Sequence, residues 1–135
     1  MNKNNKLEDS LNKIFTKSVY KMVDVSSKES THRKALATGE IILGSHVIEM
    51  IKTKKMPKGD PMVVAEISGI NGVKKTSELI PLCHPLSLDH ISLHCEINEK
   101  KHSIIVYCLV SANSKTGVEM EALSGVNSAL LAIYD

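Results

Sequence analysis

An alternating stretch late in the chain limits the possible folds more than any other feature. Over residues 91–97, apolar side chains occupy every second position and polar ones lie between them. This period-two pattern predicts a strand with one buried and one exposed face. A polar turn at residues 98–101 separates it from residues 103–112, which are apolar enough for the central strand of a sheet. Together the two strands predict an antiparallel hairpin.

A third strand and a short helix are predicted before this hairpin. The strand lies within residues 33–43 and ends at Gly44. Ser45 is then expected to cap a helix that reaches about Lys52. A basic loop with proline and glycine follows at residues 54–59 and predicts a break before the next helix.

The next helix has a strong start signal. Asp60 precedes Pro61, and an N-cap aspartate accepts amide protons while proline fits the first helical position. The helix is expected to reach about Leu79. Gly69 and Gly72 within it either weaken the helix or let another backbone approach closely.

A final helix is predicted from about Val118 onward. One face of it is expected to carry the large residues Leu123, Val126, Leu130 and Ile133. Strands and helices thus alternate along the chain, with a hairpin in its second half. This order predicts an α+β sandwich in which helices pack on one face of an antiparallel sheet.

Composition places the chain among small globular domains. Of its 135 residues, 42% are hydrophobic, so one domain with its own core is expected. No apolar run approaches the ~20 residues of a membrane helix, and no apolar leader follows residues 1–6, which predicts a cytoplasmic protein without membrane contact. Residues 1–21 are polar and lysine-rich, and either a short amphipathic helix or a frayed N-terminal extension fits them.

Charge, aromatic content and cysteine spacing argue against two other classes. The net charge is only +2 and aromatic residues make up 3%, which argues against a nucleic-acid-binding module. Cys83, Cys95 and Cys108 form no CxxC pair, so no metal site is predicted and reduced thiols are expected.

Two segments with lysines are candidates for phosphate binding. Lys58 directly precedes a helix start, where the dipole attracts anions, although a solvated basic loop also fits. Lys74 and Lys75 lie near the end of the same predicted helix. Ordinary complementation of the helix dipole explains them equally well.

Two further segments carry acid–base groups. His84 lies in a loop stiffened by Pro81 and Pro85, where an imidazole can be an acid, a base or a phosphate contact, or merely structural. Glu119 and Glu121 lie at a helix start. They can serve acid–base chemistry or accept two N–H groups of a guanine-like edge, or simply complement the helix dipole. Spacing alone does not show that these segments meet.

Five motifs nevertheless resemble those of one family. In chain order they are MVDVS at 22–26, KGD at 58–60, LIPLCHPL at 79–86, KTGVEMEAL at 115–123 and IYD at 133–135. They resemble the molybdenum cofactor biosynthesis protein C family, the cyclic pyranopterin monophosphate synthases. The resemblance defines a synthase domain over residues 22–135 and leaves residues 1–21 as an N-terminal extension.

This resemblance implies a fold, an assembly and a reaction. The fold is expected to be a ferredoxin-like α+β sandwich. The assembly is expected to be a homo-oligomer, a hexamer built as a trimer of dimers, with active sites at a dimer interface. The reaction rearranges a cyclised dihydro-GTP intermediate, a purine nucleotide derivative, to cyclic pyranopterin monophosphate and releases diphosphate. It requires no cofactor, although magnesium can accompany the triphosphate.

The resemblance also implies residue roles. Asp135 matches the active-site acid/base, and Lys58 and Lys74 match active-site lysines, with Lys58 expected in catalysis. Arg33, the only arginine, offers a bidentate fork for the triphosphate. The remaining matches form two substrate-binding segments, namely Leu82, Cys83 and His84, and then Met120 and Glu121 with Glu119 beside them.

One difference from the family concerns the end of the sequence. Family members continue past the Tyr-Asp motif with a further catalytic lysine, whereas this sequence stops at Asp135. A catalytically impaired nucleotide-binding subunit of the same family is therefore the alternative to an active synthase.

Overall fold

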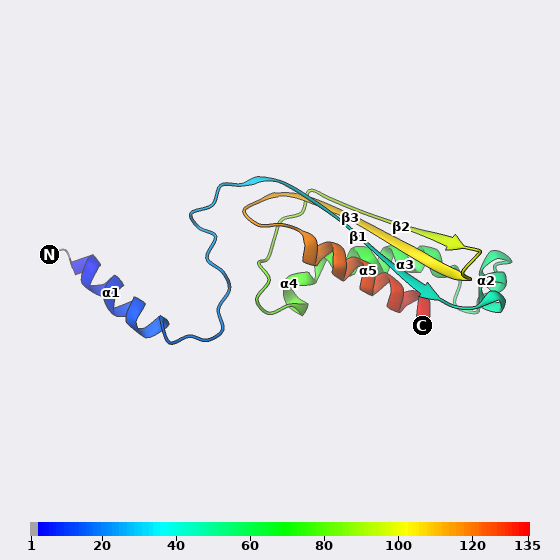
Figure 1. The fold of residues 1–135 in the computed structure, drawn as a ribbon, viewed down its shortest axis with the longest axis horizontal. Helices are drawn as coiled ribbons and strands as arrows, with labels where there is room; N and C mark the ends of the chain where they lie inside the picture. The colour runs from blue at the N-terminus through cyan, green and yellow to red at the C-terminus, as the bar shows by residue number, and fades with distance from the viewer. Residues whose placement is uncertain (1–2) are drawn as a thin grey trace.

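The computed structural model describes residues 3–135, and Figure 1 shows a sheet with helices on one face. Its elements in chain order are α1 (Lys3–Phe15), β1 (Thr31–Ile42), α2 (Ser45–Lys52), α3 (Pro61–Lys74), α4 (Thr76–Leu79), β2 (His90–Asn98), β3 (Ser103–Ser114) and α5 (Glu119–Tyr134). None of these helices is long and apolar enough to cross a membrane.

The three strands form an antiparallel sheet in the order β1-β3-β2. Cys108 of β3 pairs with Ala37 of β1 on one side and with Leu93 of β2 on the other. The predicted hairpin and the central place of its second strand are confirmed. The α+β class with helices on one face is also confirmed. The ferredoxin-like detail is not confirmed by the three strands that residues 3–135 form.

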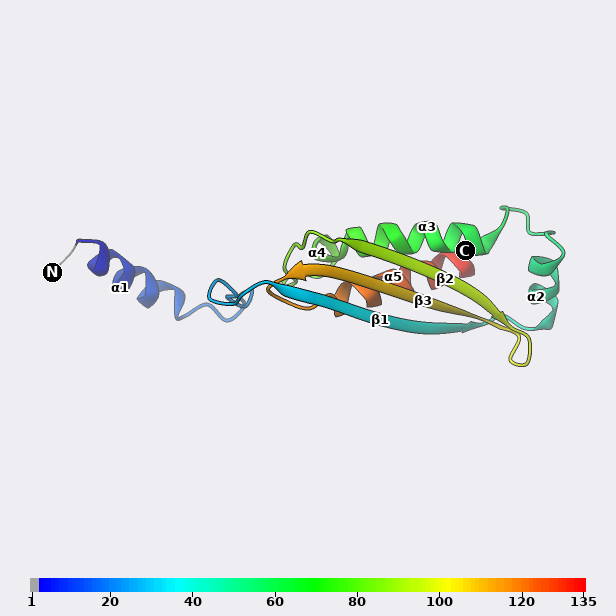
Figure 2. The same cartoon turned by 90° about the horizontal axis from the view of Figure 1, so that it is seen from above.

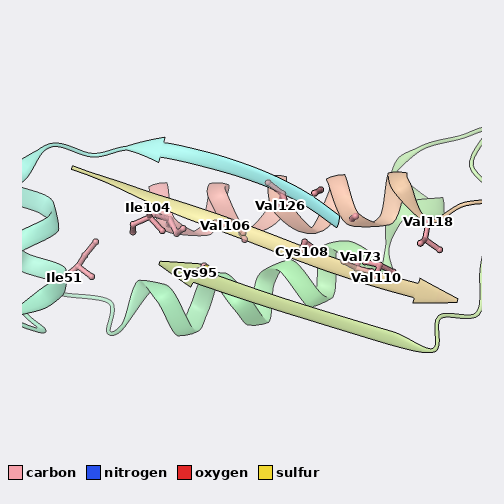
Figure 3. Close-up of a cluster of buried hydrophobic side chains, with 14 of the residues drawn as sticks. Ile51, Val73, Cys95, Ile104, Val106, Cys108, Val110, Val118 and Val126 are labelled. Atoms are coloured by element: carbon pink, nitrogen blue, oxygen red, sulfur yellow. The ribbon is translucent and has the colours of Figure 1, made fainter. Parts of the chain in front are cut away.

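Alternate side chains of the sheet point toward α3 and α5 and make the core (Figure 3). Ile104, Val106, Cys108 and Val110 of β3 are almost completely buried. Burial raises the pKa of Cys108 to about 11, because the surrounding apolar groups do not solvate a thiolate. The core cysteines are therefore packing residues.

Helices α3 and α5 approach closely through small residues. A Cβ atom added to Gly72 would overlap the Ser128 side chain and lie 2.9 Å from the Ser124 backbone oxygen. A Cβ added to Gly125 would lie 2.6 Å from Cys108 Sγ. Of the two predicted effects of the glycines in α3, close approach of another backbone is the one observed.

Three details differ from the prediction. Gly44, at φ +84, is the N-cap of α2, and no side chain caps this helix, so the expected Ser45 cap is wrong. The expected helix to Leu79 is interrupted at Lys75, and the buried hydroxyl of Thr76, the first residue of α4, donates to the Val73 carbonyl oxygen across the break. Leu123 is exposed, since the face of α5 that meets α3 requires small residues.

The N-terminal extension contains a helix. Residues 3–15 form α1, which Figure 2 shows away from the sheet, while residues 1 and 2 lie outside the described part of the chain. Its apolar side chains are exposed: Leu7, Leu11, Ile14 and Phe15. Helix formation, one of the two alternatives for this segment, is thus observed.

Candidate active site

The loop after α4 and the loop before α5 meet around a pocket of about 290 Å³. Its wall includes all six residues of the two predicted substrate-binding segments, Leu82, Cys83, His84, Glu119, Met120 and Glu121. These six residues form the first cluster. Two motifs that are far apart in sequence therefore line a single cavity.

Glu121 is the buried acid of the first cluster, with 3% of its surface exposed. Its Oε1 accepts a hydrogen bond from Cys83 Sγ at 3.9 Å, whereas Oε2 is buried with no partner in the described part of the chain. Burial raises the pKa of this carboxyl, and the charge of Glu119 raises it further. A buried oxygen without a partner is suited to a ligand N–H group.

Lys74 borders the first cluster. As the last residue of α3, it lines an adjoining pocket of about 260 Å³, which shares Leu86 and Glu121 with the first. A cation is thereby placed next to the buried acid. This arrangement suits a ligand that carries both hydrogen-bonding groups and phosphate.

Lys58 and Asp135 form a second cluster. Lys58 Nζ donates to Asp135 Oδ2 and to the Asp135 backbone oxygen, each at 2.9 Å. Gly59, at φ +97, turns the chain between Lys58 and Asp60, whose carboxylate caps α3 by accepting from the Met62 N–H. A pocket of about 220 Å³ adjoins the pair, whose side chains are 71% and 82% exposed.

Arg33 lines neither the pockets of the first cluster nor that of the second. It lies near the start of β1, paired with Ala112 of β3. Its Nε is buried with no hydrogen-bond partner among residues 3–135. The predicted phosphate fork thus keeps an unsatisfied donor, near the end of β3 that leads into the loop of the first cluster.

The two clusters lie at opposite ends of α5. Glu119 begins this helix and Asp135 follows its last residue, so its 16 residues span about 24 Å. Figure 1 shows the start of α5 and the C-terminus at these opposite ends. The residues predicted as one site are therefore separated within a single chain.

Metal binding and one residue without a predicted role, Lys115, remain to be described. Residues 3–135 contain no group of three His, Cys, Asp or Glu side chains able to hold a metal ion. The sequence predicts no role for Lys115, yet its Nζ donates to the Ser26 carbonyl oxygen, and Lys115 directly precedes Thr116 in the pocket wall. The available signals were the MVDVS and KTGVEMEAL motifs, which contain Ser26 and Lys115, although the prediction gave neither residue a role.

The fold and the pockets define an α+β protein suited to a small ligand with polar and anionic groups. Residues 22–135 match the model of the MoaC family, and the chain belongs to this family. The match begins where the N-terminal extension ends.

Three relatives illustrate the similarity. The chain is 47% identical over 114 residues to the "Cyclic pyranopterin monophosphate synthase" of Clostridium perfringens, covering 84% of this chain and 72% of the relative. It is 46% identical to the "Cyclic pyranopterin monophosphate synthase, mitochondrial" of Arabidopsis thaliana, covering 84% of this chain and 42% of that protein. It is 40% identical to "Molybdenum cofactor biosynthesis protein 1" of Mus musculus, covering 84% of this chain and 18% of that protein. The chain therefore spans less than half of the Arabidopsis and mouse proteins.

Proposed function

We propose that this protein is a cyclic pyranopterin monophosphate synthase, a lyase of molybdenum cofactor biosynthesis. It rearranges the cyclised dihydro-GTP intermediate to cyclic pyranopterin monophosphate and releases diphosphate. The gathering of both substrate-binding motifs around one pocket carries this proposal. The names of the relatives also favour an active synthase over a catalytically impaired subunit.

The first cluster binds the substrate. Glu121 Oε2, which is buried without a partner, receives an N–H group of the base-derived ring. Glu119 lies beside it in the same pocket wall. Lys74 contacts the phosphates from the adjoining pocket, and Arg33 contributes its guanidinium fork.

The second cluster supplies proton transfer. Opening the imidazole ring and closing the pyrazine ring both require protons to move at nitrogen and oxygen. The ammonium of Lys58 and the carboxylate of Asp135, 2.9 Å apart, are an acid and a base in contact. In the last step an internal hydroxyl attacks the α-phosphorus, its proton passes to a base, and the bond to diphosphate breaks as diphosphate leaves with the electron pair.

Two copies of the chain complete each site. The clusters are about 24 Å apart along α5, so one chain does not bring its own two clusters together. A twofold axis across the middle of α5 would place the first cluster of one copy against the second cluster of its partner, because a twofold interface exchanges the two ends. Each dimer would then hold two complete sites.

The solvent side of the helix layer offers the surface for this pairing. It carries exposed apolar side chains from both helices, Val63, Val64 and Ile67 of α3 with Leu123, Leu131 and Tyr134 of α5. These six residues are the apolar helix face. Helices that are apolar on their outer side are normally covered by another element. The face lies between the two clusters, so pairing through it brings the clusters together.

A second surface suits assembly beyond the dimer. The sheet face opposite the helices exposes Leu36 and Ile42 of β1. Two interfaces per chain are what a hexamer made as a trimer of dimers needs. We propose this assembly, a cytoplasmic location, and a reaction without a resident cofactor in which magnesium enters with the triphosphate. Light scattering of the purified protein tests the hexamer.

A turnover assay tests the function. Purified protein receives the cyclised dihydro-GTP substrate, and the pterin product and diphosphate are measured together. Equimolar formation of both supports the proposal, and formation of neither at any enzyme concentration contradicts it. Lys55→Met, an exposed change in the loop that carries Lys58, is the matched control for loss of Lys58.

A further inference from the structure

Residues 23–26, the clamp segment, cross between the two loops that form the first cluster. His84 Nε2 lies 2.7 Å from the Val23 carbonyl oxygen, and Lys115 Nζ donates to the Ser26 carbonyl oxygen at 2.9 Å. His84 belongs to the loop after α4, and Lys115 to the loop before α5. Figure 1 shows the chain between α1 and β1 passing the end of the molecule where α4 and the start of α5 lie.

The clamp segment has an ordered turn of its own. The Ser26 backbone N–H donates to Asp24 Oδ1 at 2.8 Å, which is an Asx turn. The Lys28 N–H donates to the Val25 carbonyl at 3.1 Å. The carbonyls of Val23 and Ser26 are thereby held in place to accept from the two loops.

The contact with Val23 determines which nitrogen of His84 carries a proton. A carbonyl oxygen only accepts hydrogen bonds, so His84 Nε2 must be the protonated nitrogen. In the neutral ring Nδ1 is then the acceptor and the only nitrogen left for a ligand. The clamp segment thus determines how His84 can act in the pocket that it lines.

We propose that the clamp segment joins the two walls of the pocket and holds His84 in the Nε2–H form, with Lys115 as the positioning residue that anchors it. Lys115 acts through residues 23–26 and does not touch the substrate. The effect of the clamp segment on turnover rests on the proposed function, whereas the protonation of His84 at Nε2 does not.

A spectroscopic experiment on the full chain tests the clamp directly. In protein with ¹⁵N-labelled histidine, the Nε2–H of His84 is expected to give its own NMR signal, because an acceptor shields it from exchange with water. Loss of that signal in His84→Gln assigns it. Lys115→Met is expected to remove the signal and to speed exchange of the Ser26 and Lys28 amides about tenfold, as loss of a charge-assisted hydrogen bond predicts. Lys115→Arg, which keeps the donor, is expected to retain both.

Lys21→Met is the matched control, since it removes an exposed lysine two residues before Val23. The clamp is contradicted if Lys115→Met keeps the signal and the amide protection, or if Lys21→Met loses them equally. In the turnover assay, Lys115→Met is expected to lower kcat about tenfold with little change in KM, and Lys115→Arg to restore it. An unchanged kcat would overturn the positioning role. Absence of turnover in the unaltered protein would instead count against the proposed function, and the NMR result would still decide the clamp.

Discussion

The two ends of α5 carry the two clusters in opposite environments. At its start, Glu121 is buried, two loops line the pocket, and the clamp segment contacts both loops. At its end, Lys58 and Asp135 meet at 2.9 Å with most of both side chains exposed to water. Charges interact weakly in water and strongly in an enclosed site. The start of α5 is thus organised within one chain, whereas the ion pair at its end would be strengthened by the second chain that we propose to cover it.

The largest expected effect is the loss of turnover when Lys58 or Asp135, the exposed cluster at the end of α5, is changed. Lys58→Met or Asp135→Asn should lower kcat roughly 10³-fold, in the range for loss of a general acid or base. The thermal midpoint should hardly change, since exposed ion pairs contribute little to stability. Turnover and thermal unfolding of both variants check this, with Lys55→Met as the control. Activity within threefold of the unaltered protein would remove the pair from catalysis.

The next largest effect is expected at the contact between α3 and α5, the helix that has one cluster at each end. Gly72→Ala places a methyl group against Ser128 and the Ser124 backbone, and overpacking of this kind costs roughly 1–3 kcal/mol of unfolding free energy. Denaturant unfolding measures the loss. Asn71→Ala, the exposed neighbour on α3, should change stability by less than about 0.5 kcal/mol. Equal losses in the two variants would show that helix contact is not the cause.

A smaller effect concerns the buried acid. Because the pKa of Glu121 is raised in the fold, the folded state binds more protons than the unfolded state just above the acid's usual pKa. Stability should therefore fall as pH rises through this window and then stay lowered at neutral pH. Glu121→Gln should flatten that slope and raise the midpoint at pH 7, while weakening substrate binding. A Glu121→Gln variant that is less stable at pH 7 would contradict the burial argument.

The smallest effect is on the thiol beside this acid. Burial and the Glu121 carboxylate both raise the pKa of Cys83, so its thiolate is scarce at neutral pH. Iodoacetamide at pH 8 should modify Cys83 more slowly than a free cysteine, and Glu121→Gln should speed the reaction a few-fold. Mass spectrometry of the modified peptide gives both rates. A faster reaction in the unaltered protein than in Glu121→Gln would show that the Glu121 carboxylate does not lie beside Cys83.

Local patterns predicted much of this fold. The alternation at residues 91–97 located β2, and Asp60 with Pro61 located the start of α3, because both signals lie within a few residues. The exposure of Leu123 was not predicted, since the buried face of α5 depends on the glycines of α3. Lys58, His84, Glu119 and Glu121 were candidates from their chemistry and local setting, whereas the roles of Leu82, Met120 and Asp135 came from family motifs alone. The separation of the two clusters along α5 could not be predicted, because it depends on how α3 and α5 pack.

The central claim is that each site takes its first cluster from one chain and its second from another. The most direct test mixes Lys58→Met with His84→Gln, which alter the second and the first cluster and are each expected to be inactive alone. After co-expression or joint refolding, mixed dimers would contain one intact site, and activity should return to about a quarter of the unaltered level, as random twofold pairing predicts. A mixture that forms mixed dimers and stays as inactive as its components would contradict the account.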